Sequence, residues 1–427
     1  MNETGNSCLF LLQNSWHEAL WTSGEKVWVS LKHFGCDRST DHGEIRGRKM
    51  DEEASEGFKT SAFFDVKQSD KHSITLRSSK FGVTTKFMAP VKRFTKLHNK
   101  SITALDISSG GGLGVSASTD ETLLLWDTAT GTVRRTFTGH AGEVNCCKFF
   151  PSGVVVLSGG MDTQLKIWST EDGSCARTLS GSHNASISCT EVVDRGRNII
   201  SCSNDGTARL WECGSATCIS CITKHNSKIN ASSLTTVSSA LCVPSTGDTM
   251  TTHQNDLEFE TKDKVLITGS ENGDLLGYDV ANRTEVLSFK CRDSVNCCTF
   301  LNETTFAVGL QDGTILLMDI LKPGQPLLSF KTLASAVLCL SQSRHSSHSL
   351  AFWASFADGR SSLFYVVIRN GDLSEKAESS QTYKLELQLQ LELSGPDCDP
   401  VNCIVQSSDG FIYTASRDAV VRKYKVF

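Results

Sequence analysis

The stretch Gly139–Ser169, GHAGEVNCCKFFPSGVVVLSGGMDTQLKIWS, decides how the rest of the sequence is interpreted. It contains two runs with strand-like alternation, Val144–Phe149 and Gln164–Trp168, and a β-branched run between them, Val154–Leu157. Glycine, proline and aspartate stand at the junctions, where they favour tight turns. The stretch therefore predicts short antiparallel strands joined by turns.

The same pattern recurs on both sides of this stretch. His98, His140 and His183 lie 42 and 43 residues apart, and in each copy an aspartate follows 22 residues later and a tryptophan 6 residues after that. A period of about 40–45 residues with these features is typical of a WD-repeat β-propeller. About seven such repeats would use most of the 427 residues. We therefore expect an all-β fold, a seven-bladed propeller.

The period is absent from residues 1–82, which predict a small β-rich N-terminal domain with a charged, mobile segment at 37–56. Residues 83–427 predict the propeller, with polar insertions at about 235–263 and 369–382. The candidate elements of the N-terminal domain are a helix at Asn14–Thr22 and strands at Val27–Phe34, Ala62–Val66 and Ser73–Arg77.

The two ends of the propeller sequence predict one shared blade. Thr84–Leu97 has the pattern of an outermost strand, but no inner strands precede it. The C-terminus supplies three strands without a fourth. Joining both ends would close the ring and remove open sheet edges. These C-terminal strands are expected at Pro400–Gln406, Phe411–Ala415 and Val420–Tyr424.

Composition narrows the class of protein. A net charge of −5 argues against a broad nucleic-acid-binding face. No apolar run approaches the roughly 20 residues of a membrane span, so we expect a soluble chain in the cytoplasm, with the nucleus as a second compartment. The 17 cysteines lack zinc-type spacing, and the pairs in mid-strand point to opposite faces. Buried, reduced thiols are the interpretation we favour.

A histidine, a serine, an aspartate and a tryptophan recur together in each regular repeat. Ser, His and Asp can form a nucleophilic site, but an active site is needed once and these sets occur three times. Resemblance to WD-repeat proteins implies that the histidine bridges the aspartate and the serine, and that the serine reaches the indole. We therefore expect no catalytic residue, no cofactor and no metal. The three structural tetrads are His98, Ser116, Asp120 and Trp126; His140, Ser158, Asp162 and Trp168; and His183, Ser201, Asp205 and Trp211.

What remains for function is the surface of the loops. The loops that precede each innermost strand and the loops with the Asp turns carry both signs of charge, which suits a polar protein interface. For any single residue of these loops, the alternative to contact with a partner is that the side chain is simply exposed to solvent. The candidate partner-binding residues are Lys100, Glu143, Met161, Lys228, Glu271, Arg292, Asp293, Asp397, Asp399 and Arg417.

Several stretches are similar to one family, the proteasomal ATPase-associated factors, and two of them, SGGMD and VDRGRN, are not required by propeller architecture. The stretches include SGGMD at Ser158–Asp162, VDRGRN at Val193–Asn198 and DGTARLWECG at Asp205–Gly214. The resemblance is dense over residues 78–218, patchy over 290–427 and thin before 78. It implies a non-enzymatic assembly chaperone that binds an ATPase subunit of the proteasome regulatory-particle base and restrains its docking on the proteolytic core.

Two other classes of protein remain open from the sequence. One is a WD-repeat scaffold or substrate receptor of another complex, such as a ubiquitin ligase. The other is a propeller hydrolase with its site on the ring axis, for which the sequence offers no asymmetric catalytic cluster. In each non-enzymatic case we expect a chain that is monomeric on its own.

Overall fold

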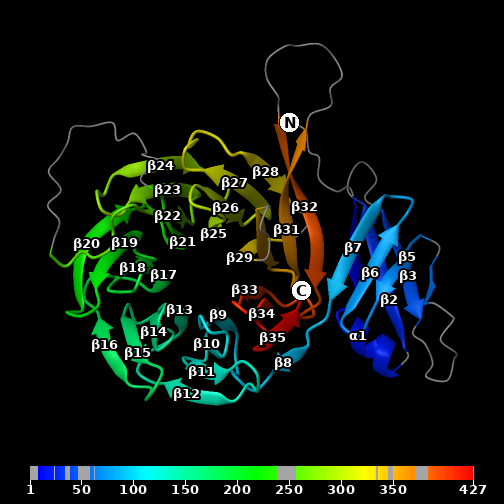
Figure 1. The fold of residues 1–427 in the computed structure, drawn as a ribbon, viewed down its shortest axis with the longest axis horizontal. Helices are drawn as coiled ribbons and strands as arrows, with labels where there is room; N and C mark the ends of the chain where they lie inside the picture. Colours follow the sequence, from blue (N-terminus) through cyan, green and yellow to red (C-terminus); the bar gives the residue numbers. More distant parts are fainter. Residues whose placement is uncertain are drawn as a thin grey trace, which may run out of the picture.

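The computed structural model describes residues 8–23, 25–33, 39–46, 58–61, 63–238, 256–332, 335–344, 350–370 and 383–426. Seven blades of four antiparallel strands stand in a ring, and a further group of strands lies at its side (Figure 1). The all-β, seven-bladed fold expected from the sequence is confirmed. No helix among the described residues is long and apolar enough to cross a lipid bilayer.

Blades one to three are the regular repeats. Blade one contains β9 (Ile102–Ile107), β10 (Leu113–Ser118), β11 (Leu123–Asp127) and β12 (Val133–Phe137). Blade two contains β13 (Val144–Phe149), β14 (Val155–Gly160), β15 (Leu165–Ser169) and β16 (Cys175–Leu179). Blade three contains β17 (Ile187–Val193), β18 (Asn198–Ser203), β19 (Thr207–Glu212) and β20 (Thr217–Lys224).

Blades four to six keep this order with less regular sequences. Blade four contains β21 (Ile229–Thr236), β22 (Lys264–Ser270), β23 (Asp274–Asp279) and β24 (Glu285–Lys290). Blade five contains β25 (Val295–Phe300), β26 (Thr305–Leu310), β27 (Thr314–Asp319) and β28 (Leu328–Lys331). Blade six contains β29 (Val337–Gln342), β30 (Ala351–Phe356), β31 (Ser361–Asn370) and β32 (Tyr383–Leu393).

Blade seven is built from both chain ends. It contains β33 (Val401–Gln406), β34 (Phe411–Ser416), β35 (Val421–Lys425) and β8 (Lys92–Phe94). Lys423 pairs with Lys92 and Val421 with Phe94. The innermost strand of blade seven also contacts that of blade one.

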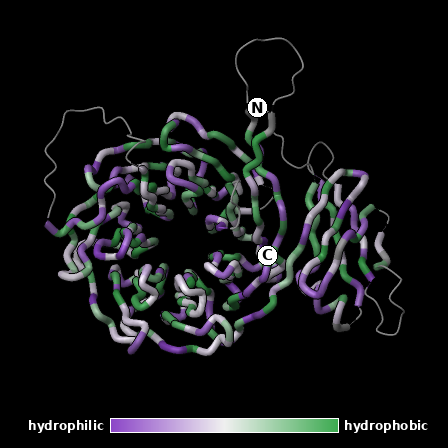
Figure 2. The backbone as a smooth tube through the Cα atoms, in the orientation of Figure 1, coloured by the Kyte–Doolittle hydropathy of each residue, from purple (hydrophilic) through white to green (hydrophobic). Residues whose placement is uncertain are grey.

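Burial explains why each strand occupies its place in a blade. The second strands, such as β18 and β26, are buried on both faces because neighbouring blades cover them, and their sequences are almost continuously apolar or small. The fourth strands β12 and β16 expose four of five residues, and their sequences are polar. Figure 2 shows the resulting mixture of hydrophobic and hydrophilic segments around the ring.

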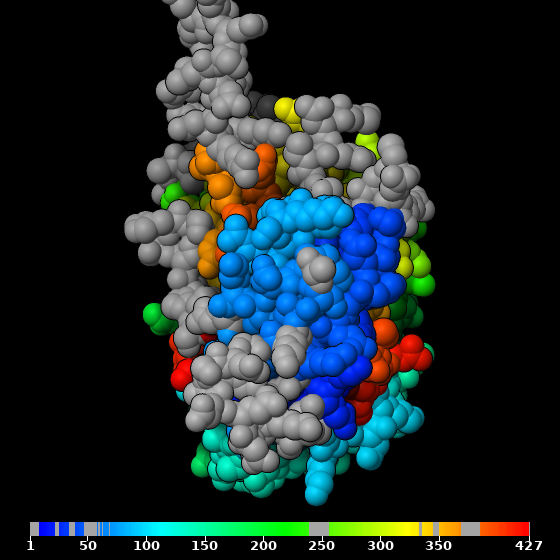
Figure 3. Space-filling model, turned by 90° about the vertical axis from the view of Figure 1, so that its right-hand side faces the viewer, coloured from blue at the N-terminus to red at the C-terminus, as the bar shows by residue number. Residues whose placement is uncertain are grey.

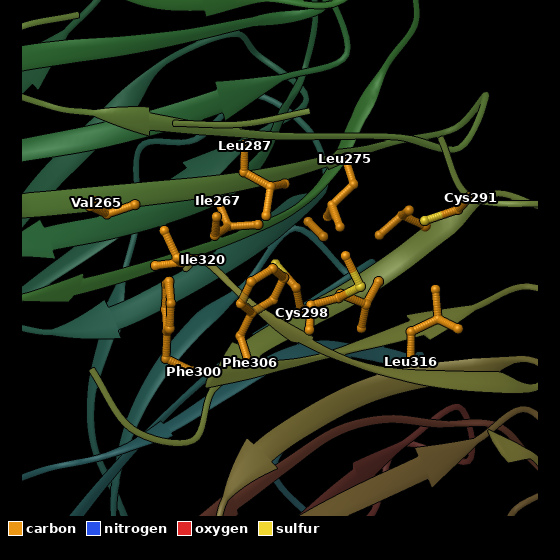
Figure 4. Close-up of a cluster of buried hydrophobic side chains, with 14 of the residues drawn as sticks. Val265, Ile267, Leu275, Leu287, Cys291, Cys298, Phe300, Phe306, Leu316 and Ile320 are labelled. Atoms are coloured by element: carbon orange, nitrogen blue, oxygen red, sulfur yellow. The ribbon is translucent and has the colours of Figure 1, made fainter. Parts of the chain in front are cut away.

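Apolar cores fill the spaces between blades. Between blades four and five, Ile267, Leu275, Phe300 and Phe306 pack with Cys298 in one cluster (Figure 4). Burial raises the pKa of Cys298 well above its usual value, so this thiol stays protonated and packs as a small apolar group.

A ring of side-chain hydrogen bonds joins neighbouring innermost strands. In six blades, the second residue of that strand is Thr, Ser or Asn, and it donates to the carbonyl of the first residue in the next innermost strand. In blade six this position is Leu338, which has no such donor. The six bonds run from Thr103 to Val144, Asn145 to Ile187, Ser188 to Ile229, Asn230 to Val295, Asn296 to Val337 and Asn402 to Ile102.

Asn402 makes the bond of this ring that joins blade seven to blade one. Its amide donates to the Ile102 carbonyl at 2.7 Å and to the Ser101 hydroxyl at 3.0 Å. We expect Asn402→Ala to lower the free energy of unfolding by about 1–2 kcal/mol, because the buried carbonyl loses its donor. The measurement is the denaturant midpoint. Asn226→Ala is the control, since Asn226 is exposed and should change the midpoint little; equal effects would contradict the prediction.

The N-terminal strands form two sheets beside blade six. β1 (Cys8–Leu12), β2 (Lys26–His33), β3 (Thr40–Arg46) and β4 (Lys59–Thr60) make one sheet. The other contains β5 (Asp65–Ser69), β6 (Ser73–Ser78) and β7 (Val83–Met88), and it continues blade six because β7 pairs in parallel with β32. In Figure 3 the N-terminal strands lie directly against the C-terminal strands of blade six. The core of this region includes Phe10, Trp16, Val29, Ile74 and Phe87.

Three expectations for the N-terminal region need correction. The segment 37–56 is not mobile throughout, because Thr40–Arg46 is strand β3 and pairs with β2; its remaining parts lie largely outside the described residues. The strand expected at Ala62–Val66 begins at Asp65. The helix expected at Asn14–Thr22 is shorter, with α1 at Trp16–Glu18 followed by one turn of π-helix at Ala19–Ser23.

The segment Thr84–Leu97 is not one strand, as the sequence suggested. Pro90 has no N–H to continue a ladder, and the pairing changes around it. Ala89 donates its N–H to the His72 carbonyl, whereas Val91 donates to the Lys423 carbonyl. The domain boundary expected between residues 82 and 83 is therefore too early, because β7 still pairs with the N-terminal β6. The change from the N-terminal strands to blade seven occurs at Pro90.

The two expected insertions fall mainly outside the described residues, which resume at 256 and 383. The end of the first insertion returns to blade three. The buried Asn198 side chain donates to the Leu257 carbonyl at 3.0 Å and accepts from the Phe259 N–H at 2.5 Å. The Asn198 amide thus binds the main chain of residues 257–259 both as a donor and as an acceptor.

Candidate protein-interaction face

The loops expected to bind a partner meet in pairs on one face of the ring. In every blade, the turn between the second and third strands donates a main-chain N–H to the loop before the innermost strand. Because this bond recurs in all seven blades, the paired loops form one continuous rim. The bonds run from Thr119 to Ser101, Met161 to Glu143, Asn204 to Ser186, Glu271 to Lys228, Gln311 to Ser294, Ala357 to Ala336 and Arg417 to Pro400.

Below this rim, the structure brings together the four side chains of each predicted tetrad. The distance from His Nε2 to Ser Oγ is 2.7 Å in all three blades. The indole donates to the same Ser Oγ at 3.2, 2.8 and 2.7 Å in blades one, two and three. The His Nδ1 lies 3.3, 2.8 and 2.9 Å from the Asp carboxylate in the same order. The contacts link the second and third strands to the preceding loop.

The electrostatics of a tetrad keep the histidine neutral. Burial lowers the pKa of His183, against the opposing effect of Asp205. Burial raises the pKa of Asp205, but hydrogen bonds from Thr207 and Asn184 outweigh it and hold this pKa at about 2. A neutral histidine that donates from Nδ1 to the carboxylate can accept the Ser201 hydroxyl proton at Nε2.

The tetrad serines are sealed from solvent. Ser116, Ser158 and Ser201 are each 0% exposed, so no substrate can reach their hydroxyls. The Ser201 oxygen already receives the Trp211 N–H. We infer that the tetrads fasten strands together, because every buried polar group in them has a partner. Among the described residues, no three His, Cys, Asp or Glu side chains gather to hold a metal ion.

The other blades keep only parts of this arrangement. In blade four His225 bonds to Thr268 at 2.8 Å, and its Nδ1 has no partner among the described residues, because Asn272 stands at the aspartate position. In blade five the histidine, serine and tryptophan positions are apolar, since Cys291, Val308 and Met318 pack in one cluster, whereas the aspartate is kept as Asp312. Loss of the polar set here is compensated by apolar packing rather than by another polar network.

The ten candidate partner-binding residues are spread around the rim. Two groups of them interact: Lys228 lies 3.4 Å from Glu271, and the Met161 N–H bonds to the Glu143 carbonyl. Met161 is 61% exposed, which is unusual for methionine. The exposed members are Lys100, Glu143, Met161, Lys228, Glu271, Arg292, Asp397 and Arg417, whereas Asp293 and Asp399 are half-buried.

One part of the rim is already occupied by the N-terminal domain. Asn14 donates to the Pro396 carbonyl at 3.1 Å and to the Asp397 carboxylate at 3.2 Å. Next to it, the Trp16 indole donates to Ser394 Oγ at 2.7 Å in a buried contact. Sequence reasoning missed this junction, because nothing in Asn14–Trp16 signals a contact almost 400 positions away.

The repeated four-stranded blades and the geometry of the tetrads define the class of protein to which the chain belongs. Residues 89–127, 131–169 and 173–212 match the family model described as WD domain, G-beta repeat. The chain is a WD-repeat β-propeller protein.

Similarity to curated proteins extends beyond the repeats. The chain is 39% identical to proteasomal ATPase-associated factor 1 of Gallus gallus and 37% identical to that of Homo sapiens, in both cases over 97% of this chain and 98% of the relative. It is 32% identical to the 26S proteasome regulatory subunit RPN14 of Saccharomyces cerevisiae over 45% of this chain and 46% of that protein. The chain belongs to the proteasomal ATPase-associated factor 1 family.

Proposed function

We propose that the chain is a non-catalytic, proteasome-associated binding protein. In finer terms, it is an assembly chaperone that binds an ATPase subunit of the regulatory-particle base and restrains its association with the proteolytic core. The observation that carries this proposal is full-length similarity to relatives whose name includes association with the proteasomal ATPase. The N-terminal strands and the ring are both covered by the similarity.

The geometry supports binding rather than catalysis. The repeated Ser–His–Asp sets are buried fasteners, and the exposed polar groups form a rim around a ring held together by inter-blade hydrogen bonds. A rigid face of this kind suits recognition by charge and shape. When it engages the ATPase near its docking tail, the bulk of the propeller excludes the proteolytic core until the factor leaves.

The first test is co-purification. We expect the tagged chain to retain free base ATPase subunits and to be absent from the completed holoenzyme in the cytoplasmic and nuclear fractions. Mass spectrometry of the retained proteins reads out the result. Recovery only with a ubiquitin ligase or another unrelated complex would instead support the scaffold alternative and contradict the proposal.

The second test addresses the rim. We expect the triple variant Lys100→Glu, Arg292→Glu and Arg417→Glu to bind the ATPase roughly tenfold more weakly, because it reverses the basic part of the interface. Surface plasmon resonance at constant salt measures this change. A matched control reverses three exposed basic residues on the N-terminal sheet, Lys67, Arg77 and Lys80. If only the control loses binding, the partner occupies the N-terminal domain and not the rim.

A further inference from the structure

A cavity of about 60 Å³ lies where the N-terminal domain meets blades five and six. β1 and β7 form one side of it, and β28, β30, β31 and β32 form the other. Figure 1 shows β7 beside β32 at this junction. The volume is several times what one water molecule needs. The walls are mainly apolar, and Phe330, Phe356, Phe364 and Leu389 contribute to them.

A carboxylate lies on the wall of this cavity because of a β-bulge. Along β32 the residues alternate, so Glu392 would be expected on the opposite face from Leu389. The register shifts, however: Phe364 pairs with Leu389, whereas Ser362 pairs with Glu392. Paired residues share a face, so the extra residue brings Glu392 to the same apolar face as Leu389 and Phe364. Its side chain is 5% exposed.

Among the described residues, the charge of Glu392 is poorly compensated. The nearest cation among them, Arg360, lies 3.8 Å away, which is too far for a hydrogen bond. Arg360 is held by Asp358, with Nε and Nη2 at 3.0 and 2.9 Å from the carboxylate. Burial raises the pKa of Glu392 to about 7, although Arg360 lowers it. A buried carboxylate in this state gains from any donor cation that enters the cavity.

The cavity walls suit a cation with an apolar stem. Aromatic faces attract cations, and Phe356 already lies 5.9 Å from the Arg360 guanidinium. The other cation of the lining, Lys331, lies 2.7 Å from the Asp312 carboxylate. Both cations of the lining are thus bonded to an aspartate, and Glu392, the one carboxylate of the lining, has only the 3.8 Å contact with Arg360.

We infer that this cavity is a binding pocket for the side chain of a lysine presented by a partner protein. The four-carbon stem lies along the phenylalanine and leucine walls, and the ammonium donates to the Glu392 carboxylate. The pocket borders the rim turns of blades five and six, because Lys331 and Arg360 of its lining bond to Asp312 and Asp358 there, so a protein bound at the rim can also present a lysine to it.

The test uses the full-length chain and two small probes that differ only in the terminal ammonium group. Nα-acetyl-lysine N-methylamide should bind with a Kd of about 1–10 mM, and its norleucine counterpart should bind at least roughly tenfold more weakly. Isothermal titration or NMR chemical shifts read out binding. Affinity should rise between pH 6 and pH 8, because deprotonation of Glu392 in that range provides the acceptor. The assay contains no proteasomal protein, so its failure leaves the proposed function standing.

Two variants complete the experiment. Glu392→Gln keeps the shape and removes the charge, and it should abolish the preference for lysine over norleucine. Glu285→Gln, at an exposed position on β24, is the matched control and should leave that preference unchanged. Equal binding of both probes by the natural chain would identify an apolar cavity only and overturn the inference. Lysine selectivity that survives Glu392→Gln, or that does not change with pH, would overturn it as well.

Discussion

Replacing Trp16 with alanine is expected to lower the free energy of unfolding by about 3–5 kcal/mol. Trp16 is 0% exposed and packs in the N-terminal core, and its indole donates to Ser394 Oγ, directly after β32 of blade six. The variant therefore loses both a large apolar contact and the donor for a buried hydroxyl. It should also release the N-terminal domain to limited proteolysis, since the contact links that domain to the ring.

Trp28→Ala is the matched control for this prediction. Trp28 is the same residue type in the same domain but is 48% exposed. Its removal should change stability by no more than about 0.5 kcal/mol. Differential scanning calorimetry measures both variants without depending on tryptophan fluorescence. Equal losses of stability in the two variants would mean that Trp16 is not a link between the domain and the ring.

The second large effect is expected for Ser201→Ala in blade three. The Ser201 hydroxyl lies 2.7 Å from both His183 Nε2 and Trp211 Nε1. Its removal leaves a buried acceptor and a buried donor without partners. Each orphaned group costs about 1–3 kcal/mol, so the loss should be about 2–4 kcal/mol.

Circular dichroism during urea unfolding gives the size of this loss. Ser174→Ala, on the exposed turn before β16, serves as the control and should be close to neutral. The corresponding position of blade five is naturally Val308 in an apolar setting. A near-neutral Ser201→Ala would therefore indicate that blade three repacks without its polar set, as blade five does.

The regular blades could be predicted because their signal is periodic and local. The spacing of His98, His140 and His183 repeats a unit that cannot bury its faces alone, so the ring follows from the period. In blade five, where Met318 stands at the Trp position, the innermost-strand sequence Val-Asn-Cys still marked the blade. That sequence has a physical basis now visible in the structure, since Asn145, Asn296 and Asn402 each bond to the next blade.

What the sequence could not predict depends on contacts between distant segments. The parallel pairing of β7 with β32 joins residues about 300 positions apart, and no local pattern encodes it. The change of partner at Pro90 was hidden inside an apparently continuous strand. Glu392 has the alternation of a solvent-facing residue, and only the bulge together with the cover from the N-terminal domain makes it part of a cavity.

The same limit applies to the candidate interaction face. The sequence identified rim positions such as Met161 and Arg417, because loop positions follow from the repeat. It did not show that Asp397 is in contact with Asn14, since that contact comes from the other end of the chain.

The missing side-chain hydrogen bond at Leu338 makes the connection between β7 and β8 important for how blades six and seven are joined. Blades six and seven lack the side-chain bond that joins the other neighbours, yet β7 is paired to blade six and β8 to blade seven. The short link through Pro90 thus joins the two blades from outside, at the place where the ring of side-chain hydrogen bonds is interrupted. Because β8 lies near residue 92 and its partner β35 near residue 421, blade seven can be completed only after almost all of the sequence has been synthesised.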